Sequence, residues 1–370
     1  YYPNQFIAAS MSNELSNTEK LSEFYEELKR LEIKVQQPCI NECFAEFIPK
    51  ENILYYALGA IKNVGYQAIS QVVAERIKNG KFKSISDFIN RINPKNINKL
   101  QLEGLVKSGA FDSIFSNRKV LYENIPNIII NSKNIFENKS NNQSSLFGEE
   151  SNNISFLIND KNTMRWPNDE LLAKEFESVG FFISNHPLEN YQDLLAQNNV
   201  VNYKDFENGS DNECFLAGTI LSVKERKTAK GNSFAIIKFS DLSKVFEIFL
   251  FSEMLEKNRS NLKEGKSFKL TVIRDIDNKD NRFRRLNVRN IIDLNEIKDS
   301  NYSDVFIEIS SLTNMKELYK LINEKGDSKI KISIEENNKN YLFELKDKRK
   351  FNYQTLKFLN NEPYIKKITV

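Results

Sequence analysis

A five-residue turn, Ile61–Gly65, contains residue types that can form a binding site for a phosphate group. It stands directly before a run of apolar residues at helical spacing, which Gly80 ends. Backbone N–H groups at the start of a helix, together with the helix dipole, favour a phosphate oxygen. Gly65 permits a positive φ or a close approach, and nearby lysines attract a polyanion whatever its sequence. The residues predicted to contact a nucleic-acid duplex are Lys62, Asn63, Val64, Gly65, Lys81 and Lys83.

The same turn resembles the hairpin of a helix-hairpin-helix motif. Asn63 stands where that motif usually has another glycine. Because Asn enters the left-handed region more readily than most residues, we expect the turn to form. An ordinary helical hairpin with one C-cap glycine is the alternative, since the spacing alone fits both.

A second candidate is the apolar pair Leu146-Phe147, which lies in a polar stretch from about 131 to 160. The surrounding Asn, Ser, Lys and Gln residues have too little apolar surface to fold alone, which predicts a flexible linker. An exposed Leu and Phe gain nothing in the free chain, whereas burial in a partner's pocket contributes about 1.5–3 kcal/mol for each. We interpret Gln143, Leu146 and Phe147 as a peptide that binds a partner protein.

Two basic clusters lie among predicted strands between residues 213 and 297. Basic loops beside aromatic residues are typical of single-strand binding by OB folds, and a solvated basic hairpin is the alternative. The strands carry Phe234, Phe239, Phe249 and Phe251, and most of these four are assigned to the core that a small barrel must fill. The predicted single-strand contacts are Lys224, Arg226, Lys227, Lys230, Arg282, Phe283, Arg284 and Arg285.

The composition argues against several other kinds of chemistry. Cys39, Cys43 and Cys214 form no disulfide framework, and the one histidine, His186, lacks the partners of a tetrahedral zinc site. No phosphate-binding Gly-rich Lys motif, nucleophile elbow or membrane-spanning run occurs, and the net charge is only +3. We therefore predict no catalytic residue, metal or cofactor in this chain, no membrane partner and a cytoplasmic location.

The elements that would position these residues fall into three regions. Helical periodicity dominates the first third, with helices begun by Asn17 or Thr18, by a capping box of Ser84 and Asp87, and by Pro94. Five strands follow, with a short helix between the third and fourth, in the order of an OB barrel. The last region, residues 303–370, alternates strand, helix, strand, strand, helix and strand, which predicts a small α+β domain of split βαβ type. The expected fold is multidomain: an α-helical helix-hairpin-helix region, an OB-fold β-barrel and an α+β C-terminal domain.

Taken in order, these segments resemble the alpha subunit of bacterial DNA polymerase III, from the end of its fingers to its C-terminus. Two departures, Asn63 for a glycine and Ser243-Lys244 for a Ser-Gly turn, concern local geometry. The segments that carry the resemblance are Tyr2–Ala9, Asn17–Lys20, Gly59–Gly65, Leu105–Asp112, Gln143–Phe147, Glu175–Leu188, Lys230–Asn232, Asp241 and Phe251.

The resemblance implies a set of partners. The hairpin would hold the primer-template duplex, Gln143 to Phe147 the sliding clamp, the OB domain the single-stranded template, and the final domain the tau subunit of the clamp loader. It also implies a DNA-directed DNA polymerase whose two magnesium ions bind palm carboxylates upstream of Tyr1, so that this portion is expected to be inactive alone.

The expected domains follow from the same resemblance. They are the end of the fingers (1–58), the helix-hairpin-helix domain (59–130), the linker with the clamp peptide (131–165), a helical connector (166–212), the OB-fold domain (213–297) and a partner-binding domain (303–370). The alternatives are a stand-alone nucleic-acid adaptor with the same domains and no polymerase, and a scaffold that does not contact nucleic acid, which the weak net charge would favour.

Overall fold

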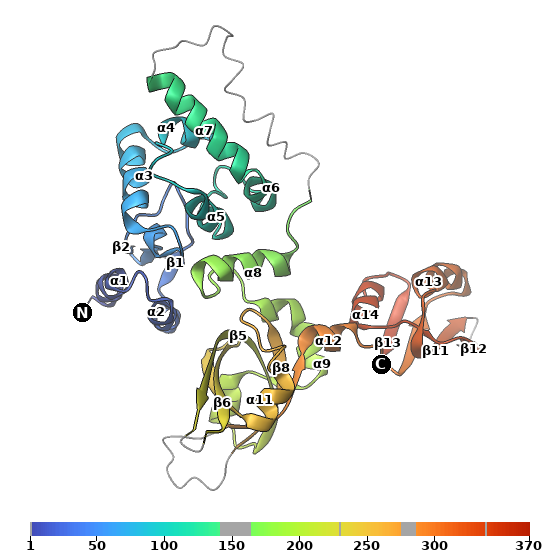
Figure 1. Cartoon of the computed structure of the whole chain (residues 1–370). Coiled ribbons are helices and arrows are strands. Elements are labelled where there is room, and N and C mark those ends of the chain that lie inside the picture. Colours follow the sequence, from blue (N-terminus) through green and yellow to red (C-terminus); the bar gives the residue numbers. More distant parts are fainter. Residues whose placement is uncertain (1, 141–163, 229–230, 275–285, 337–338) are drawn as a thin grey trace. The chain divides into compact units, whose positions relative to one another are not determined.

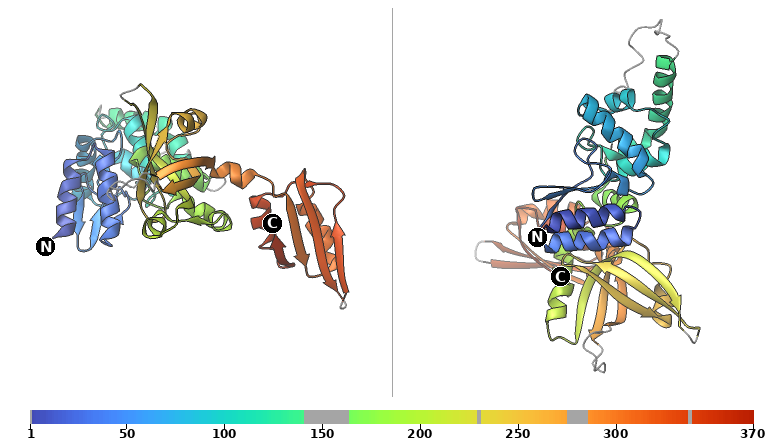
Figure 2. Two further views of the ribbon diagram at one scale, coloured as in Figure 1. Left: turned by 90° about the horizontal axis from the view of Figure 1, so that it is seen from below. Right: turned by 90° about the vertical axis from the view of Figure 1, so that its left-hand side faces the viewer.

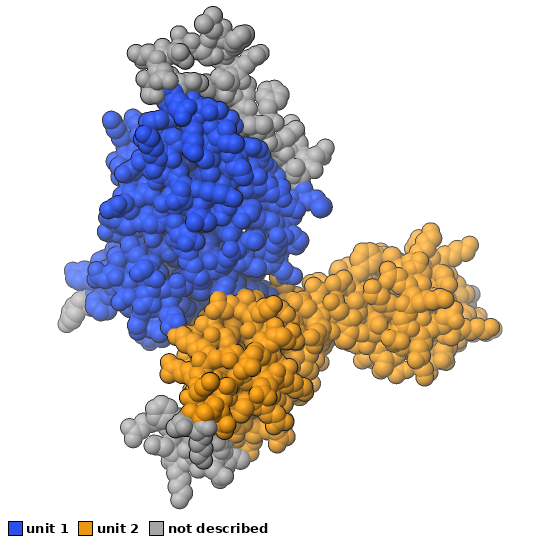
Figure 3. All heavy atoms as spheres, in the orientation of Figure 1, with its two compact units in different colours: residues 1–189 blue, residues 190–370 orange. Residues whose placement is uncertain are grey.

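The computed structural model describes residues 2–140, 164–228, 231–274, 286–336 and 339–370. The chain divides into two compact units, residues 1–189 and 190–370 (Figure 3). Their helices and strands are labelled in Figure 1. Within the described part, no helix is both long enough and apolar enough to cross a membrane. Several predicted contacts lie outside the described residues: Gln143, Leu146, Phe147, Lys230, Arg282, Phe283, Arg284 and Arg285.

Unit 1 is mainly helical. Its first two helices, α1 (Pro3–Asn13) and α2 (Thr18–Arg30), lie side by side (Figure 2). Three short strands then pair in the order β1-β3-β2. The remaining elements of the unit are β1 (Lys34–Gln36), β2 (Ile48–Lys50), β3 (Ile53–Tyr55), η1 (Leu58–Ala60), α3 (Tyr66–Asn79), α4 (Ile85–Arg91), α5 (Lys99–Lys107), α6 (Arg118–Glu123), α7 (Ile125–Ser140) and α8 (Asn168–Val179), with η5 (Pro187–Tyr191) at its end.

One hydrophobic core runs through unit 1, from Ile7 of α1 to Ile183 beyond α8. The predicted boundary at residue 58 therefore does not coincide with a break in the core. The predicted linker begins inside α7, which extends to Ser140. Of the predicted connector, α8 belongs to unit 1 and the residues after Glu189 belong to unit 2.

Side-chain caps set several helix boundaries as predicted. Asn17 accepts a hydrogen bond from the backbone N–H of Lys20, and Ser84 accepts one from that of Asp87. The Ser84 capping box is incomplete, however, because the Asp87 carboxylate accepts from the N–H of Lys83. The helix predicted to begin at Pro94 begins instead at Lys99, because Asn98 and Gln101 form a complete capping box there.

Unit 2 opens with α9 (Gln192–Gln197), β4 (Val200–Val201) and α10 (Tyr203–Asn208), followed by five strands in the order β7-β6-β5-β8-β9. These strands occur close to where the sequence predicted them. The long strand β5 pairs with β8 through Glu213–Thr219 and with β6 through Thr219–Lys227. The ladder with β6 has a register shift between Ile220 and Ser222. The bounds are β5 (Glu213–Lys227), β6 (Ser233–Ser240), β7 (Val245–Phe251), α11 (Ser252–Asn258), β8 (Ser267–Arg274), β9 (Leu286–Asp293) and α12 (Leu294–Asp299).

The sheet is not a closed barrel in the described residues. The end strands β7 and β9 approach each other, but no ladder joins them. A hydrophobic core separate from that of unit 1 lies inside the sheet. Its most buried members include Leu216, Ile237, Phe239, Ile248 and Leu270. The OB assignment therefore stays a prediction.

The C-terminal domain has a four-stranded sheet in the order β12-β11-β10-β13 and a separate core. β10 and β11 are parallel neighbours joined by α13, so no strand separates them and the predicted split βαβ arrangement is wrong. The elements are β10 (Asp304–Ile309), η6 (Leu312–Asn314), α13 (Met315–Leu321), β11 (Lys325–Glu336), β12 (Lys339–Glu344), α14 (Tyr353–Leu359) and β13 (Ile365–Thr369).

A buried carboxylate holds the end of α8 in the core of unit 1. Oε1 of Glu175 accepts hydrogen bonds from the backbone N–H groups of Ile183 and Ser184, at 3.0 and 2.9 Å. Its Oε2 lies 3.7 Å from Nη1 of Arg118, and both side chains are less than a tenth exposed. Removing one member of such a pair leaves buried polar groups unpaired, which is costly.

Glu175→Ala is therefore expected to destabilise unit 1 by about 3 kcal/mol or more. The only tryptophan, Trp166, is buried against Tyr122 in this unit, so its fluorescence reports urea unfolding of unit 1. Glu170→Ala removes an exposed carboxylate from the same helix and should cost below about 1 kcal/mol. Equal midpoints for the two variants would contradict the assigned role of Glu175.

Candidate nucleic-acid interface

The predicted turn forms between η1 and α3, with the backbone conformation that its residue types favour. Asn63 has φ 66° and Gly65 has φ 75°, both in the region that most residues avoid. Gly65 is the N-cap of α3 and has no side chain to offer the helix. The N–H groups of the first turn, from Tyr66 to Ala68, therefore lack a side-chain cap.

This uncapped helix start opens into a cavity of about 780 Å³. One wall is the hairpin with the first residue of α3, and the other is the turn between α1 and α2. Lys62, Asn63 and Gly65 are exposed. The lining residues are Ser12, Asn13, Leu15, Ser16, Thr18, Gly59–Tyr66 and Gln101. The cavity thus presents backbone donors, small polar side chains and one lysine, which suits an anionic ligand.

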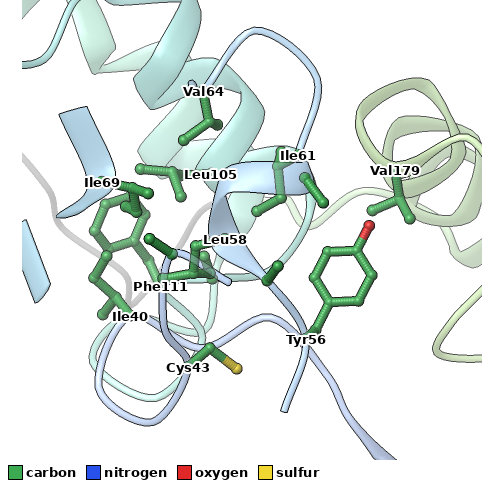
Figure 4. Close-up of a cluster of buried hydrophobic side chains, with 14 of the residues drawn as sticks. Ile40, Cys43, Tyr56, Leu58, Ile61, Val64, Ile69, Leu105, Phe111 and Val179 are labelled. Carbon is green, nitrogen blue, oxygen red and sulfur yellow. The ribbon is translucent and has the colours of Figure 1, made fainter. Parts of the chain in front are cut away.

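Val64 supports the hairpin and has no group left for a ligand. Its side chain is buried with Leu58, Ile61 and Leu105 (Figure 4), its N–H donates to the Ile61 carbonyl and its carbonyl accepts from Gln101. Of the six residues predicted to contact a duplex, Val64 is therefore the one whose contribution is to shape the turn.

Two residues that the sequence analysis missed hold the hairpin from α5. Nε2 of Gln101 donates to the Val64 carbonyl at 2.7 Å, while its Oε1 completes the capping box with Asn98. Gly104 allows the close approach, because a Cβ there would lie 2.8 Å from the Lys62 carbonyl oxygen. The Asn98-x-x-Gln101 spacing was a usable signal for the helix start, but nothing in it indicated the second contact of Gln101.

A hydrogen bond to α8 also fixes the backbone of Lys62. Its N–H donates to the Ser178 carbonyl near the end of α8, at 2.8 Å. Its side chain is exposed at the cavity. The turn is thus anchored by α5, α8 and its own apolar residues, while its polar edge faces outward.

The structure does not bring Lys81 and Lys83 to the hairpin. They follow α3, whose 14 residues span about 21 Å at the usual helical rise. Lys81 forms an ion pair with Glu42 at that end. These lysines would therefore contact a long ligand at a different point from the hairpin.

The predicted single-strand contacts are partly described. Lys224, Arg226 and Lys227 are exposed on the second half of β5. Of the four strand aromatics that were assigned mostly to the core, only Phe239 lies in it. The side chains of Phe234, Phe249 and Phe251 lie on the face opposite to the core residues of β6 and β7. Alternation along a strand explains the error, because a shift of one residue reverses the face.

The cysteines and the histidine lie among neighbouring groups of the described residues. Burial raises the pKa of the Cys43 thiol to about 12 and that of Cys214 to about 11, so both are neutral at pH 7. Nδ1 of His186 accepts from the Leu188 N–H. No group of three or more His, Cys, Asp or Glu side chains there could hold a metal ion.

Comparisons with known proteins agree with this arrangement. A model of the helix-hairpin-helix motif matches residues 32–121, which include the hairpin, α3 and α5. DNA polymerase III subunit alpha of Borreliella burgdorferi is 37% identical over 270 residues, which cover 71% of this chain and 23% of that protein. The same subunit of Caulobacter vibrioides is 34% identical over 275 residues, covering 73% and 24%.

The matched region belongs to the DNA polymerase III alpha subunit family. The resemblance noted in the sequence is thereby confirmed. The chain spans about a quarter of the length of the relatives it matches.

We expect substitutions of the two hairpin residues with positive φ to differ in their effect on stability. Gly65→Ala should destabilise unit 1 by about 1–3 kcal/mol, because an Ala is strained at φ 75°, ψ 137°. Asn63→Gly should change the free energy of unfolding by less than about 1 kcal/mol, because Gly tolerates the same φ. Both are measured by urea unfolding at Trp166, and an unperturbed Gly65→Ala variant would show that the assigned turn geometry is wrong.

Proposed function

We propose that this chain is a DNA-holding portion of a replicative DNA polymerase III alpha subunit, and that its hairpin binds the phosphate backbone of the primer-template duplex. The observation that carries the proposal is the uncapped start of α3, which opens beside Lys62 into the 780 Å³ cavity. The match of residues 32–121 to the helix-hairpin-helix motif supports it, as does the similarity of the chain to alpha subunits.

The contacts divide by their chemistry. The N–H groups from Gly65 to Ala68 would donate to one phosphate, with Lys62 adding charge at the same point. Asn63 would contribute an exposed amide. Lys81 and Lys83 would act at a second point along the duplex, and Lys81 would have to exchange its Glu42 partner for a phosphate. None of these contacts reads bases, so binding should be independent of sequence.

The rest of the proposal follows the family. Residues 213–297 would be an OB domain near the single-stranded template, with its predicted contacts at Lys224, Arg226, Lys227, Lys230, Arg282, Phe283, Arg284 and Arg285. Residues 303–370 would bind a partner, for which the tau subunit is the candidate. The whole protein would be a cytoplasmic, magnesium-dependent DNA polymerase, with the metal-binding palm outside this chain. A stand-alone adaptor with the same domains is the alternative.

Lys62→Ala should weaken binding of the chain to a labelled primer-template duplex equally for different sequences. The slope of log affinity against log salt concentration should fall by about 1, because one fewer counterion is released. Fluorescence anisotropy at several salt concentrations measures both quantities. Lys133→Ala, which removes an exposed lysine of α7, is the matched control and should leave the slope unchanged. An equal slope for wild type and Lys62→Ala would remove the hairpin from the interface.

The clamp peptide needs a separate test, because it lies outside the described residues. The double variant Leu146→Ala/Phe147→Ala should lose about 3–6 kcal/mol of binding to the sliding clamp, through lost burial of two apolar side chains. Phe156→Ala/Leu157→Ala offers a control, since it removes a second apolar pair nearby that lacks the preceding Gln and spacing. Surface plasmon resonance with immobilised clamp gives both affinities, and unchanged binding by the first variant would disprove the assignment.

A further inference from the structure

The sheet of the C-terminal domain ends in two edge strands of different composition. Within the described residues, its order β12-β11-β10-β13 leaves β12 and β13 each paired on one side only (Figure 1). β13 carries Lys366 and Lys367 in the middle of the strand, and lysines on an edge strand hinder pairing with another chain. β12 carries three consecutive apolar residues in its middle, Tyr341, Leu342 and Phe343. Of the two edges, β12 is therefore the one suited to pairing with another strand.

The apolar side chains of β12 are accessible on both faces of the sheet. Leu342 is 64% exposed, and Tyr341 and Phe343 are 39% and 36% exposed. Tyr341 and Phe343 lie opposite Ile334 and Ile332 of β11, which belong to the buried core. Because opposite residues of an antiparallel pair point to the same face, the two rings lie on the core side of the sheet. Another strand added at this edge would continue the core over them.

The hydrogen bonding of β12 shows which of its backbone groups face the open edge. The Leu345 N–H donates to the Ile330 carbonyl at 3.0 Å, in the register of the β11–β12 ladder. Because hydrogen-bonded and non-hydrogen-bonded pairs alternate along an antiparallel ladder, the odd-numbered residues of β12 bond to β11. The N–H and C=O groups of Asn340, Leu342 and Glu344 therefore point away from β11.

These three residues are arranged symmetrically about Leu342. A second copy related by a two-fold axis through Leu342, perpendicular to the sheet, would run antiparallel to the first. Leu342 would pair with Leu342, and Asn340 with Glu344, so that all three outward-pointing residues form hydrogen-bonded pairs. Tyr341 would lie opposite Phe343 of the other copy, at the non-hydrogen-bonded positions where side chains come closest. No like charges would stand opposite each other within the strand.

A strand of an unrelated protein could use the same backbone groups. It would not require that the three outward residues be symmetric, or that Tyr341 and Phe343 match each other across the axis. Cross-strand aromatic pairs stabilise antiparallel sheets, and the two-fold arrangement provides two of them. The composition and hydrogen bonding of β12 therefore favour a second copy of the chain.

We propose that β12 pairs with β12 of a second copy of this chain, in the antiparallel register centred on Leu342. The contact joins two four-stranded sheets into one sheet of eight strands. It goes beyond the proposed DNA contacts and does not depend on them, because it involves no residue of the hairpin. The helices and the β13 edge of the domain stay accessible for the partner proposed for residues 303–370.

Sedimentation equilibrium of the full chain without DNA, over a range of concentrations, tests the proposal. The wild type should show a monomer–dimer equilibrium. Leu342→Lys should weaken dimerisation by at least about tenfold, because two lysines then stand opposite each other at the two-fold axis. Leu342→Glu should weaken it in the same way. An equimolar mixture of the two variants should form a heterodimer, since opposite charges then meet, and this rescue excludes misfolding as the cause of the loss.

Thr369→Lys is the matched control, because it adds a lysine to β13 at the other edge, where Thr369 is exposed. It should leave dimerisation unchanged. A wild-type chain that stays monomeric at every concentration overturns the proposal and would leave β12 to a strand of another protein. Dimerisation that Leu342→Lys does not weaken overturns it as well. Variants that fail to associate when mixed would show that residue 342 does not face itself, which excludes the register.

Discussion

The buried carboxylate of Glu175 is the interaction on which the interface in unit 1 depends. It satisfies two backbone N–H groups beyond α8 and lies next to the guanidinium of Arg118. Arg118 in turn forms hydrogen bonds to the Asp112 carboxylate and the Lys107 carbonyl. One charged group thereby joins α8 to the segments around α5 and α6, and the cost of burying it is offset only while every partner is in place.

That network determines where the hairpin sits. The end of α8 supplies the Ser178 carbonyl that accepts from the Lys62 N–H, and α5 supplies Gln101 and the close approach at Gly104. A phosphate site made of backbone donors gains from such rigidity, because the donors need no reorganisation when the ligand arrives. Residues more than a hundred positions downstream are thus as important to the hairpin as its own sequence.

Local signals in the sequence were sufficient to predict the turn and many of the helices and strands. The turn, its unusual Asn63, the cap at Asn17 and the strands of unit 2 were all predicted, since each depends on a few neighbouring residues with strong preferences. The Asn98 capping box outweighed Pro94 as a helix start. The turn without glycine at Ser243 and Lys244 forms because the Asp241 carboxylate accepts from both of their N–H groups.

The predictions that were wrong concern how strands and side chains are arranged in space. Neighbouring β10 and β11 replaced a predicted split pair, since strand order depends on long-range packing that a strand-helix-strand pattern does not specify. The same holds for Lys81 and Lys83, which are near the turn in the sequence and separated from it by the length of α3. The face of Phe251 was misassigned because periodicity gives alternation but not which side is covered.

The low net charge of +3 is compatible with DNA binding at the hairpin, because the candidate site there depends on local donors and not on the charge of the whole chain. At the hairpin the attraction is electrostatic, from N–H dipoles and Lys62, and it should weaken steeply with salt. A strongly basic net charge is then unnecessary for binding at the hairpin, because its donors act locally.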